Sequence, residues 1–389
     1  MNHVKDTIYL DSNATTRVDS RVTAAIVDVW QRPGNASSHS NASGRHAQEQ
    51  LANAAKRVAE LCGGKADEIL WTSGATEANN IAVRGSGAAC REDVLSCQTE
   101  HASVLNSIAA LPSRNCEEHL GTSLLSVGPT GLLTPDQVVR AVTKSVRIVS
   151  IMLVNNEIGV IQPIADIAKA LARHHPDVLL HCDASQAGST LPIHVHDLGV
   201  DLLSLSAHKM YGPQGIGALW VRNGIRVQGA LAGGGQQNGR RPGTVPVALA
   251  VGFGEAARIC SVEGANDALR IHALRDTLWR RLQTDAGHVH LNGDQFARVA
   301  GNLNVSFDGI FAEDLIEAVP ELELSMGSAC HGERIEPSHV LVALGRNERL
   351  HSSIRIGLGR HTTSEEVQEV ATLLCNAVAQ LRALTRACG

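Results

Sequence analysis

Helical and strand patterns alternate along this chain from residue 44 onward, and this alternation limits the fold more than any other feature. Residues 44–62 carry apolar side chains at helical spacing and end at Gly63, a favourable C-cap, which predicts an amphipathic helix. Several later segments are short and rich in Leu or β-branched residues, as strands buried on both faces are: 146–154, 178–182, 202–205 and 216–221. The pattern therefore predicts an α/β protein with a doubly wound, mainly parallel sheet.

The pattern changes after about residue 258. An arginine-rich helix is expected over residues 268–282, strands over 303–307 and 322–325, and a C-terminal helix that begins at a capping box of Thr363 and Glu366. We expect a second domain to begin here.

Composition and charge exclude several classes of function. The chain has 389 residues, 43% of them hydrophobic, and 34 Lys plus Arg against 39 Asp plus Glu give a net charge of -5. No basic block is present, so nucleic acid is not expected as a direct ligand. The longest apolar stretches fall short of the roughly 20 residues of a membrane-spanning helix, and the N-terminus has no secretory h-region. We expect a cytoplasmic protein with no membrane contact.

The nine cysteines include no CxxC pair. This favours reduced thiols, most of them in the core, over a zinc ribbon, and no metal site is expected.

Lys209 is the first candidate catalytic residue. It follows a strand and enters a turn rich in small residues, where desolvation would lower the pKa of its amine and suit it to Schiff-base chemistry. A surface lysine after a strand is the alternative, and the neighbouring polar segments decide between the two.

Asp183 ends the hydrophobic strand over 178–182, at the edge where open parallel sheets bind ligands. A buried carboxylate there needs a cation, and the pyridinium nitrogen of pyridoxal phosphate (PLP) would supply one. Capping of the next helix is an equally good interpretation of Asp183 alone.

Several hydroxyl-bearing segments suit a phosphate group. Residues 72–77, with Ala75 and Thr76, lie between a strand and a helix start, where backbone N–H groups and the helix dipole favour an anion. Ser206 and His208 flank the lysine, and Thr244 lies in a Gly-rich loop. Each signal alone is equally typical of an ordinary turn.

Four further residues follow strands or lie within them. His101 and Asn155 each follow a probable strand, so an imidazole that stacks on a ring and an amide that binds a ring oxygen or substrate would share the edge of Asp183. Cys330 lies in a small polar stretch where an exposed thiol would be reactive. Arg355 is the one charge in a short strand pattern and could clamp a carboxylate or form a salt bridge.

Taken together, eight segments closely resemble the PLP-dependent cysteine desulfurases in residues, order and spacing. They are residues 72–80, 99–101, 154–159, 183–186, 206–213, 243–244, 327–330 and 336–339, and the match runs from about Ile8 to Thr363. The resemblance implies the PLP-dependent transferase fold (fold type I). It also implies a large PLP-binding domain over 16–257 with a seven-stranded sheet, and a smaller α+β domain from 1–15 and 258–389 that carries the Cys330 loop.

The resemblance also implies the roles of residues. Lys209 would form the Schiff base with PLP, Asp183 would pair with the ring nitrogen, Gln186 would bind the ring hydroxyl oxygen, and His101 would stack and relay protons. The phosphate would be held by Ala75, Thr76, Ser206 and His208, with Thr244 reaching it from the partner subunit of a homodimer. Asn155 and Arg355 would hold the substrate L-cysteine.

Cys330 would take its sulfur as a persulfide, leaving L-alanine, and pass it to an acceptor protein. In this family the acceptors serve iron–sulfur clusters, tRNA thiolation or DNA thiolation.

Departures from the family pattern fall near the acceptor side. Met326 replaces a common serine, Pro242 replaces a small residue, and His331 begins a charged run where small hydroxyl residues are common. A selenocysteine lyase, which shares these PLP contacts, and a non-catalytic scaffold of the same fold are the alternatives. A class V aminotransferase needs no loop thiol, so Cys330 argues against it.

Overall fold

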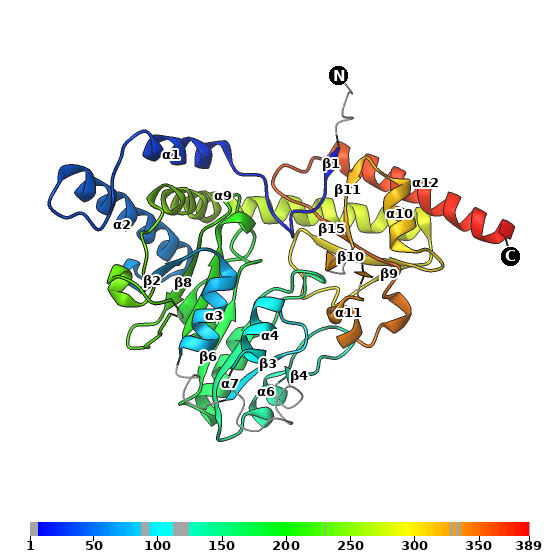
Figure 1. Cartoon of the computed structure of the whole chain (residues 1–389). Coiled ribbons are helices and arrows are strands. Elements are labelled where there is room, and N and C mark those ends of the chain that lie inside the picture. The colour runs from blue at the N-terminus through cyan, green and yellow to red at the C-terminus, as the bar shows by residue number, and fades with distance from the viewer. Residues whose placement is uncertain are drawn as a thin grey trace.

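The computed structural model describes residues 7–86, 93–111, 124–229, 231–326, 330–331, 334–335 and 337–388, with the backbone alone at 330, 331, 334, 335, 387 and 388. A seven-stranded sheet lies at the centre of the larger part of the molecule (Figure 1). Its strands, in spatial order, are β2 (Ile69–Thr72), β8 (Gly217–Val221), β7 (Leu202–Ser206), β6 (Leu179–Asp183), β5 (Val146–Met152), β3 (Asp93–Cys97) and β4 (Leu124–Leu125).

All neighbouring strands in this sheet run parallel except β8, which is antiparallel to both β2 and β7. Only residues 207–216 separate β7 from β8. This connection is too short for the crossover that a parallel pair needs, so the chain turns back on itself. The predicted mainly parallel sheet is confirmed, with this one reversal.

Helices cover both faces of the sheet, as a doubly wound fold requires. Strand residues alternate between two apolar clusters: Ile69 and Trp71 pack on the first face of the sheet, and Leu70 between them packs on the second. The first face carries α2 (Ala42–Cys62), α6 (Pro135–Ala141), α7 (Ile164–His174), α8 (Val195–Leu198) and the start of α9 (Val247–Arg281). The second face carries α3 (Ala75–Gly85) and α4 (Ala102–Ala109).

A second, four-stranded antiparallel sheet lies beside the far half of α9. Its strands in order are β12 (Ser325–Met326), β15 (Ser353–Gly357), β10 (Asn302–Phe307) and β9 (Val289–Leu291). This sheet shares an apolar cluster with Ile271 and Leu278 of α9, with α10 (Ala312–Ala318) and with α12 (Ser364–Cys388). Figure 1 shows α9 running from the large sheet on the left to α12 on the right.

The remaining elements are short. In the N-terminal segment α1 (Ser20–Trp30) packs on α9, and β1 (Ile8–Tyr9) pairs in parallel with β11 (Leu322–Glu323). Two further short strands, β13 (Cys330–His331) and β14 (Arg334–Ile335), form an antiparallel pair. The other elements are α11 (His339–Ala343), the 3-10 turns η1 (Ala66–Glu68), η3 (Ala207–Lys209), η4 (Gln236–Gly239) and η6 (Asn347–Arg349), and the π-helical turn η5 (Leu282–Ala286).

Two sequence expectations need correction. The helix expected over 268–282 is the second half of α9, which is continuous from Val247 to Arg281, so position 257/258 lies inside a helix. The strand expected over 322–325 is divided between β11 and β12, which belong to different sheets. Periodicity failed at the first half of α9 because this half is buried on two sides, against the large-sheet core and against α1 and α2, so its apolar residues do not form one stripe opposite a polar face.

The predicted capping signals at helix ends are confirmed. Gly63 has a φ of +69° and caps α2. In the capping box the Thr363 N–H donates to the Glu366 carboxylate at 2.8 Å, and the Glu366 N–H donates to the Thr363 hydroxyl at 3.1 Å. Cys62, Cys97, Cys182 and Cys260 are free and buried, as predicted for core thiols. Among the described helices, none combines the length and apolar character needed to cross a bilayer.

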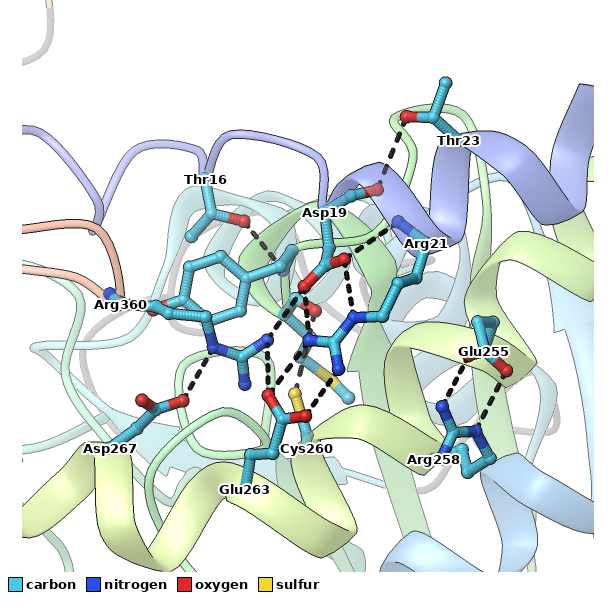
Figure 2. Close-up of polar contacts among 12 residues, drawn as sticks. Thr16, Asp19, Arg21, Thr23, Glu255, Arg258, Cys260, Glu263, Asp267 and Arg360 are labelled. Carbon is cyan, nitrogen blue, oxygen red and sulfur yellow. Dashed lines mark hydrogen bonds and ion pairs between the residues drawn. The ribbon is translucent and has the colours of Figure 1, made fainter.

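An ion cluster around Arg360 ties together three distant segments (Figure 2). The Arg360 guanidinium lies 2.6 Å from Asp267 and 3.6 Å from Glu263 on α9, and 3.2 Å from Asp19, the N-cap of α1. It also lies over the Tyr211 ring, 4.6 Å from its centroid. The cluster therefore joins the N-terminal segment, α9 and the loop after β15.

We predict that Arg360→Ala lowers the free energy of unfolding by about 3 kcal/mol, because it leaves the largely buried Asp267 without its cation, while the buried Asp19 keeps its pair with Arg21. Arg258→Ala is the matched control: Arg258 pairs with Glu255 in the same view, but its side chain is 43% exposed, so a loss of at most about 1 kcal/mol is expected. Denaturant unfolding measures both variants. Equal, small losses would contradict the structural importance of the cluster.

Candidate active site

A cavity of about 750 Å³ opens where the carboxyl ends of β2, β3, β5, β6 and β7 meet. Because these strands are parallel to one another, the polar residues that follow them gather at one edge of the sheet. Nine of the twelve sequence-predicted site residues line this cavity: Ala75, Thr76, His101, Asp183, Gln186, Ser206, His208, Lys209 and Arg355.

Lys209 is held in η3, directly after β7. Its Nζ donates hydrogen bonds to the carbonyl oxygens of Asn13 and Ala14, the latter at 2.7 Å. Burial, with a smaller effect of the nearby Arg355 cation, lowers the pKa of the Lys209 amine to about 8. A substantial fraction of the amine is therefore neutral, and nucleophilic, near physiological pH.

Asp183 ends β6 and is 6% exposed. One carboxylate oxygen accepts from the Ser185 amide at 2.9 Å and from the Ser185 hydroxyl at 2.5 Å, and the other accepts from Asn79 Nδ2 at 2.7 Å. These three donors orient the carboxylate at the cavity wall. The arrangement provides a fixed negative charge for a cationic ligand group.

The turn from β2 into α3 provides an anion site. Gly74 is the N-cap of α3, and no atom lies within 4 Å of where a Cβ would be at this position, so the start of the helix is open to the cavity. The first N–H groups of a helix have no intrahelical partner and point toward such a space. Ser206 and His208 line the same cavity, and His208 Nδ1 lies 3.1 Å from the Thr15 hydroxyl.

Burial, with the Lys209 cation, lowers the pKa of His208 to about 4. The ring is therefore neutral at pH 7, where it offers a hydrogen bond but no charge.

Arg355 comes from β15 of the second sheet and reaches into the cavity of the first. One terminal nitrogen pairs with Asp11 at 2.7 Å and the other donates to the Asn156 carbonyl at 3.1 Å. Its Nε is buried and has no partner among the described residues. An unsatisfied buried donor is costly, so a ligand carboxylate there would gain from it.

Gln186 faces the N-terminal segment. Its Nε2 donates to the Asn13 carbonyl at 2.9 Å, while its Oε1 accepts a long 3.4 Å bond from Asn13 Nδ2. The side chain therefore lines the cavity as an oriented amide.

Two predicted residues, Asn155 and Thr244, are not among the residues that line the cavity. The Asn155 side chain donates to the Thr99 carbonyl at 2.8 Å and accepts from the amides of Glu157 and Ile158, so its polar groups are already used. Its neighbour Asn156 lines the cavity instead. Thr244 is exposed in the loop before α9, away from the cavity lining.

Cys330 is described only through its backbone in β13, opposite Ile335. Its side chain lies outside the described part of the chain, as do Gly327, the rest of the run to Ala329, and residues 332, 333 and 336.

Sequence analysis missed several residues that complete the site. Asp11 pairs with Arg355, and Asn13 and Ala14 bind the Lys209 amine. They follow the strand Ile8–Tyr9, so the cue that identified Asp183, a polar residue after a strand, was present here too. Asn79 and Ser103 lie inside helices, where nothing in the pattern distinguished them from surface positions.

Comparison with known proteins identifies the class. The sequence matches the aminotransferase class-V family over residues 8–370, and the chain belongs to this family of PLP-dependent enzymes. The cysteine desulfurase IscS of Anaeromyxobacter sp. (strain Fw109-5) is 44% identical over 389 residues, which cover 98% of this chain and 95% of that protein. The family expected from the sequence is therefore confirmed.

Solved structures agree with the assignment. A NifS-like protein superposes with a TM-score of 0.86 at 28% identity, covering 96% of this chain and 99% of the other. SspA in complex with cysteine superposes with a TM-score of 0.76 at 29% identity, covering 92% and 100%. The predicted PLP-dependent transferase fold is confirmed.

The cavity fits PLP on its own features. An open helix N-terminus at Gly74 suits the phosphate, the oriented Asp183 carboxylate suits the ring nitrogen, and the partly neutral Lys209 amine suits the aldehyde carbon. The orphaned Nε of Arg355 leaves a donor for the carboxylate of a substrate.

We predict that the Lys209 amine of the apoprotein titrates near pH 8. Only the neutral amine reacts with a small acylating reagent, so labelling of Lys209 should rise with pH to a midpoint of about 8. Peptide mass spectrometry after brief labelling measures this, and the exposed Lys56 provides the pH dependence of the reagent itself. Identical pH profiles for the two lysines would show that burial does not perturb Lys209.

Proposed function

We propose that this chain is a cysteine desulfurase that uses PLP to convert L-cysteine to L-alanine and passes the sulfur from Cys330 to an acceptor protein. The observation that carries the proposal is the convergence of Lys209, Asp183 and Arg355 on one cavity. A nucleophilic amine, a carboxylate for the ring nitrogen and a free donor for an amino-acid carboxylate together suit PLP chemistry on an amino acid. The curated relatives named cysteine desulfurase support the choice of substrate.

We assign the cofactor contacts as follows. Lys209 binds PLP covalently, Asp183 pairs with the ring nitrogen, Gln186 binds the ring hydroxyl oxygen and His101 stacks on the ring. The phosphate is held by Ala75, Thr76, Ser206 and His208. Asn155 contributes indirectly, because the hydrogen bonds that its side-chain oxygen accepts from the Glu157 and Ile158 amides hold the turn that presents Asn156 to the cavity.

Arg355 orients the substrate. Its Nε is the one buried donor of the guanidinium left unpaired among the described residues, and Asp11 and the Asn156 carbonyl fix the other two nitrogens. A substrate carboxylate bound there is held at a defined distance from Lys209, whose amine moves a proton at the substrate Cα. PLP, when bound, supplies the electron sink that makes loss of that proton possible.

Transfer of the substrate sulfur to Cys330 requires no added oxidant. The Cys330 thiolate attacks the sulfur of the substrate, so an S–S bond forms as the C–S bond breaks. The electron pair stays on the former Cβ, which takes a proton, and L-alanine leaves. The product on the enzyme is the Cys330 persulfide, which a thiol of the acceptor protein then attacks.

We also propose the assembly and its setting. The chain acts in the cytoplasm as a homodimer in which Thr244 of one subunit reaches the phosphate of the other. Its exposed position outside the cavity of its own chain supports a role in the partner's site. An iron–sulfur scaffold or a tRNA- or DNA-thiolation protein receives the sulfur.

The proposed domains are 16–257 for PLP binding and 1–15 with 258–389 for the small domain. The two separate apolar clusters support this division, although α9 passes through both.

Cys330→Ser is expected to retain the visible absorbance of bound PLP and to bind cysteine, since Lys209 and Arg355 are unchanged. It should form no persulfide and release no sulfide. Mass spectrometry after incubation with cysteine checks this, with Cys375→Ser, a half-buried free thiol on α12, as the control that keeps full activity. A persulfide on another cysteine of a fully active Cys330→Ser enzyme would mean that the nucleophile is elsewhere.

Thr244→Ala and Lys209→Ala are each expected to impair turnover, yet co-expression of the two should restore part of it. In a mixed dimer one site carries both defects and the other is intact, so equal mixing should recover about a quarter of wild-type activity. Two affinity tags purify the mixed dimer for assay. A mixed dimer with no more than half the activity of the Thr244→Ala homodimer would contradict a site shared across the interface.

A further inference from the structure

Four side chains form a continuous hydrogen-bonded chain beside the cavity, from Asp183 to His101. Asn79 Nδ2 donates to Asp183 Oδ2 at 2.7 Å and to Ser103 Oγ at 2.8 Å, and Ser103 Oγ lies 2.8 Å from His101 Nδ1. Asn79 is fully buried on α3, and Ser103, in the first turn of α4, is 8% exposed. Asn79 and Ser103 have no role in the function proposed above.

The direction of each bond follows from the chemistry of the groups. The Asp183 carboxylate only accepts, so the amide nitrogen of Asn79, and not its oxygen, faces it. The second N–H of that amide is donated to Ser103 Oγ, which leaves the Ser103 hydroxyl proton free to be donated to His101 Nδ1.

A second hydrogen bond also makes Nδ1 of His101 an acceptor. His101 is the N-cap of α4, and its Nδ1 also accepts from the Ser103 backbone N–H at 3.1 Å. A backbone N–H is always a donor, so Nδ1 carries no proton. The network therefore assigns the proton of the neutral ring to Nε2.

We propose that Asn79 and Ser103 are positioning residues that hold His101 as the neutral Nε2–H tautomer beside the PLP ring. This inference rests on the proposed function, in which His101 stacks on that ring. A protonated imidazole would lose both donors at Nδ1 and would place a positive charge against a ring whose nitrogen is itself protonated. The same Asn79 amide holds the Asp183 carboxylate that favours this protonated nitrogen, so one side chain supports the charge state of both rings.

The charged groups around His101 are consistent with a neutral ring. Burial is the main cause that lowers the pKa of His101, and Lys209 and His339 lower it further, while Asp183 opposes them. Glu100, directly before His101, is fully buried, and burial raises the pKa of its carboxyl. His339 Nε2 lies 2.9 Å from the Glu100 carbonyl.

The test is the side-chain nitrogen NMR spectrum of the holoenzyme labelled with 15N-histidine, recorded across pH without substrate. The His101 signals are assigned as those missing in His101→Gln. In the wild type we expect a proton on Nε2 and none on Nδ1. Ser103→Ala removes one of two donors to Nδ1, so the pKa of His101 should rise by about half a unit or more.

Three further variants sharpen the result. Ser103→Thr keeps the hydroxyl and should restore the wild-type pKa of His101. Ser107→Ala removes another buried serine hydroxyl of α4, which is bonded to the Val104 carbonyl, and should leave the pKa unchanged. Asn79→Asp cannot donate to Ser103 and draws its hydroxyl proton away, so it should raise the pKa of His101 as Ser103→Ala does.

A proton on Nδ1 of the wild-type His101, or an unchanged pKa in both Ser103→Ala and Asn79→Asp, would overturn the proposal. If Ser103→Ala fails to fold, Ser103→Thr and Asn79→Asp still decide it. Cysteine turnover is assayed separately. An enzyme with the expected tautomer but no desulfurase activity would refute the proposed function and leave this network standing.

Discussion

Burial of the Lys209 amine is the constraint on which the rest of the site depends. A lysine at the end of a central strand is removed from water. Two carbonyl oxygens and the carboxylates of Asp11 and Asp183 favour its charged form, but burial and the nearby Arg355 cation outweigh them. The result is an amine that is reactive near neutral pH. The carbonyl oxygens of Asn13 and Ala14 offset part of the desolvation cost of that amine only while this segment stays in place. The chemistry therefore depends on how the N-terminal segment is anchored.

That anchoring explains why the two sheets form one active site. The N-terminal segment pairs with β11 beside the small sheet, and its Thr16 and Asp19 bind residues on either side of Lys209, namely His208 and Tyr211. Arg360 then fastens Asp19 to α9, as Figure 2 shows. Arg355 lies on β15, and Arg360 lies in the loop that follows this strand. A shift of the small sheet would therefore disturb both the substrate site and the lysine.

Most of the polar side chains around the cavity have a defined hydrogen-bond partner. Asp183 is fixed by three donors, His208 is neutral, and the amide of Asn79 connects the carboxylate to the Ser103–His101 pair. Among the described residues that line the cavity, Arg355 alone has a buried donor, its Nε, without a hydrogen-bond partner. A cofactor with an anionic and a cationic end, and a substrate with a carboxylate, would complete these pairs.

The sequence by itself determined the fold class and most of the site. Short apolar strands followed by polar residues are sufficient to predict where Lys209, Asp183, His101 and Thr76 meet, because parallel strands place their carboxyl ends at one edge. Only the tertiary structure decided which of Asn155 and Asn156 faces the cavity, that α9 runs unbroken past residue 258, and that Asp11, Asn79 and Ser103 complete the site. The physical reason is that periodicity reports which face of an element is apolar, whereas the direction of one polar side chain depends on hydrogen-bond partners that packing brings from distant parts of the chain.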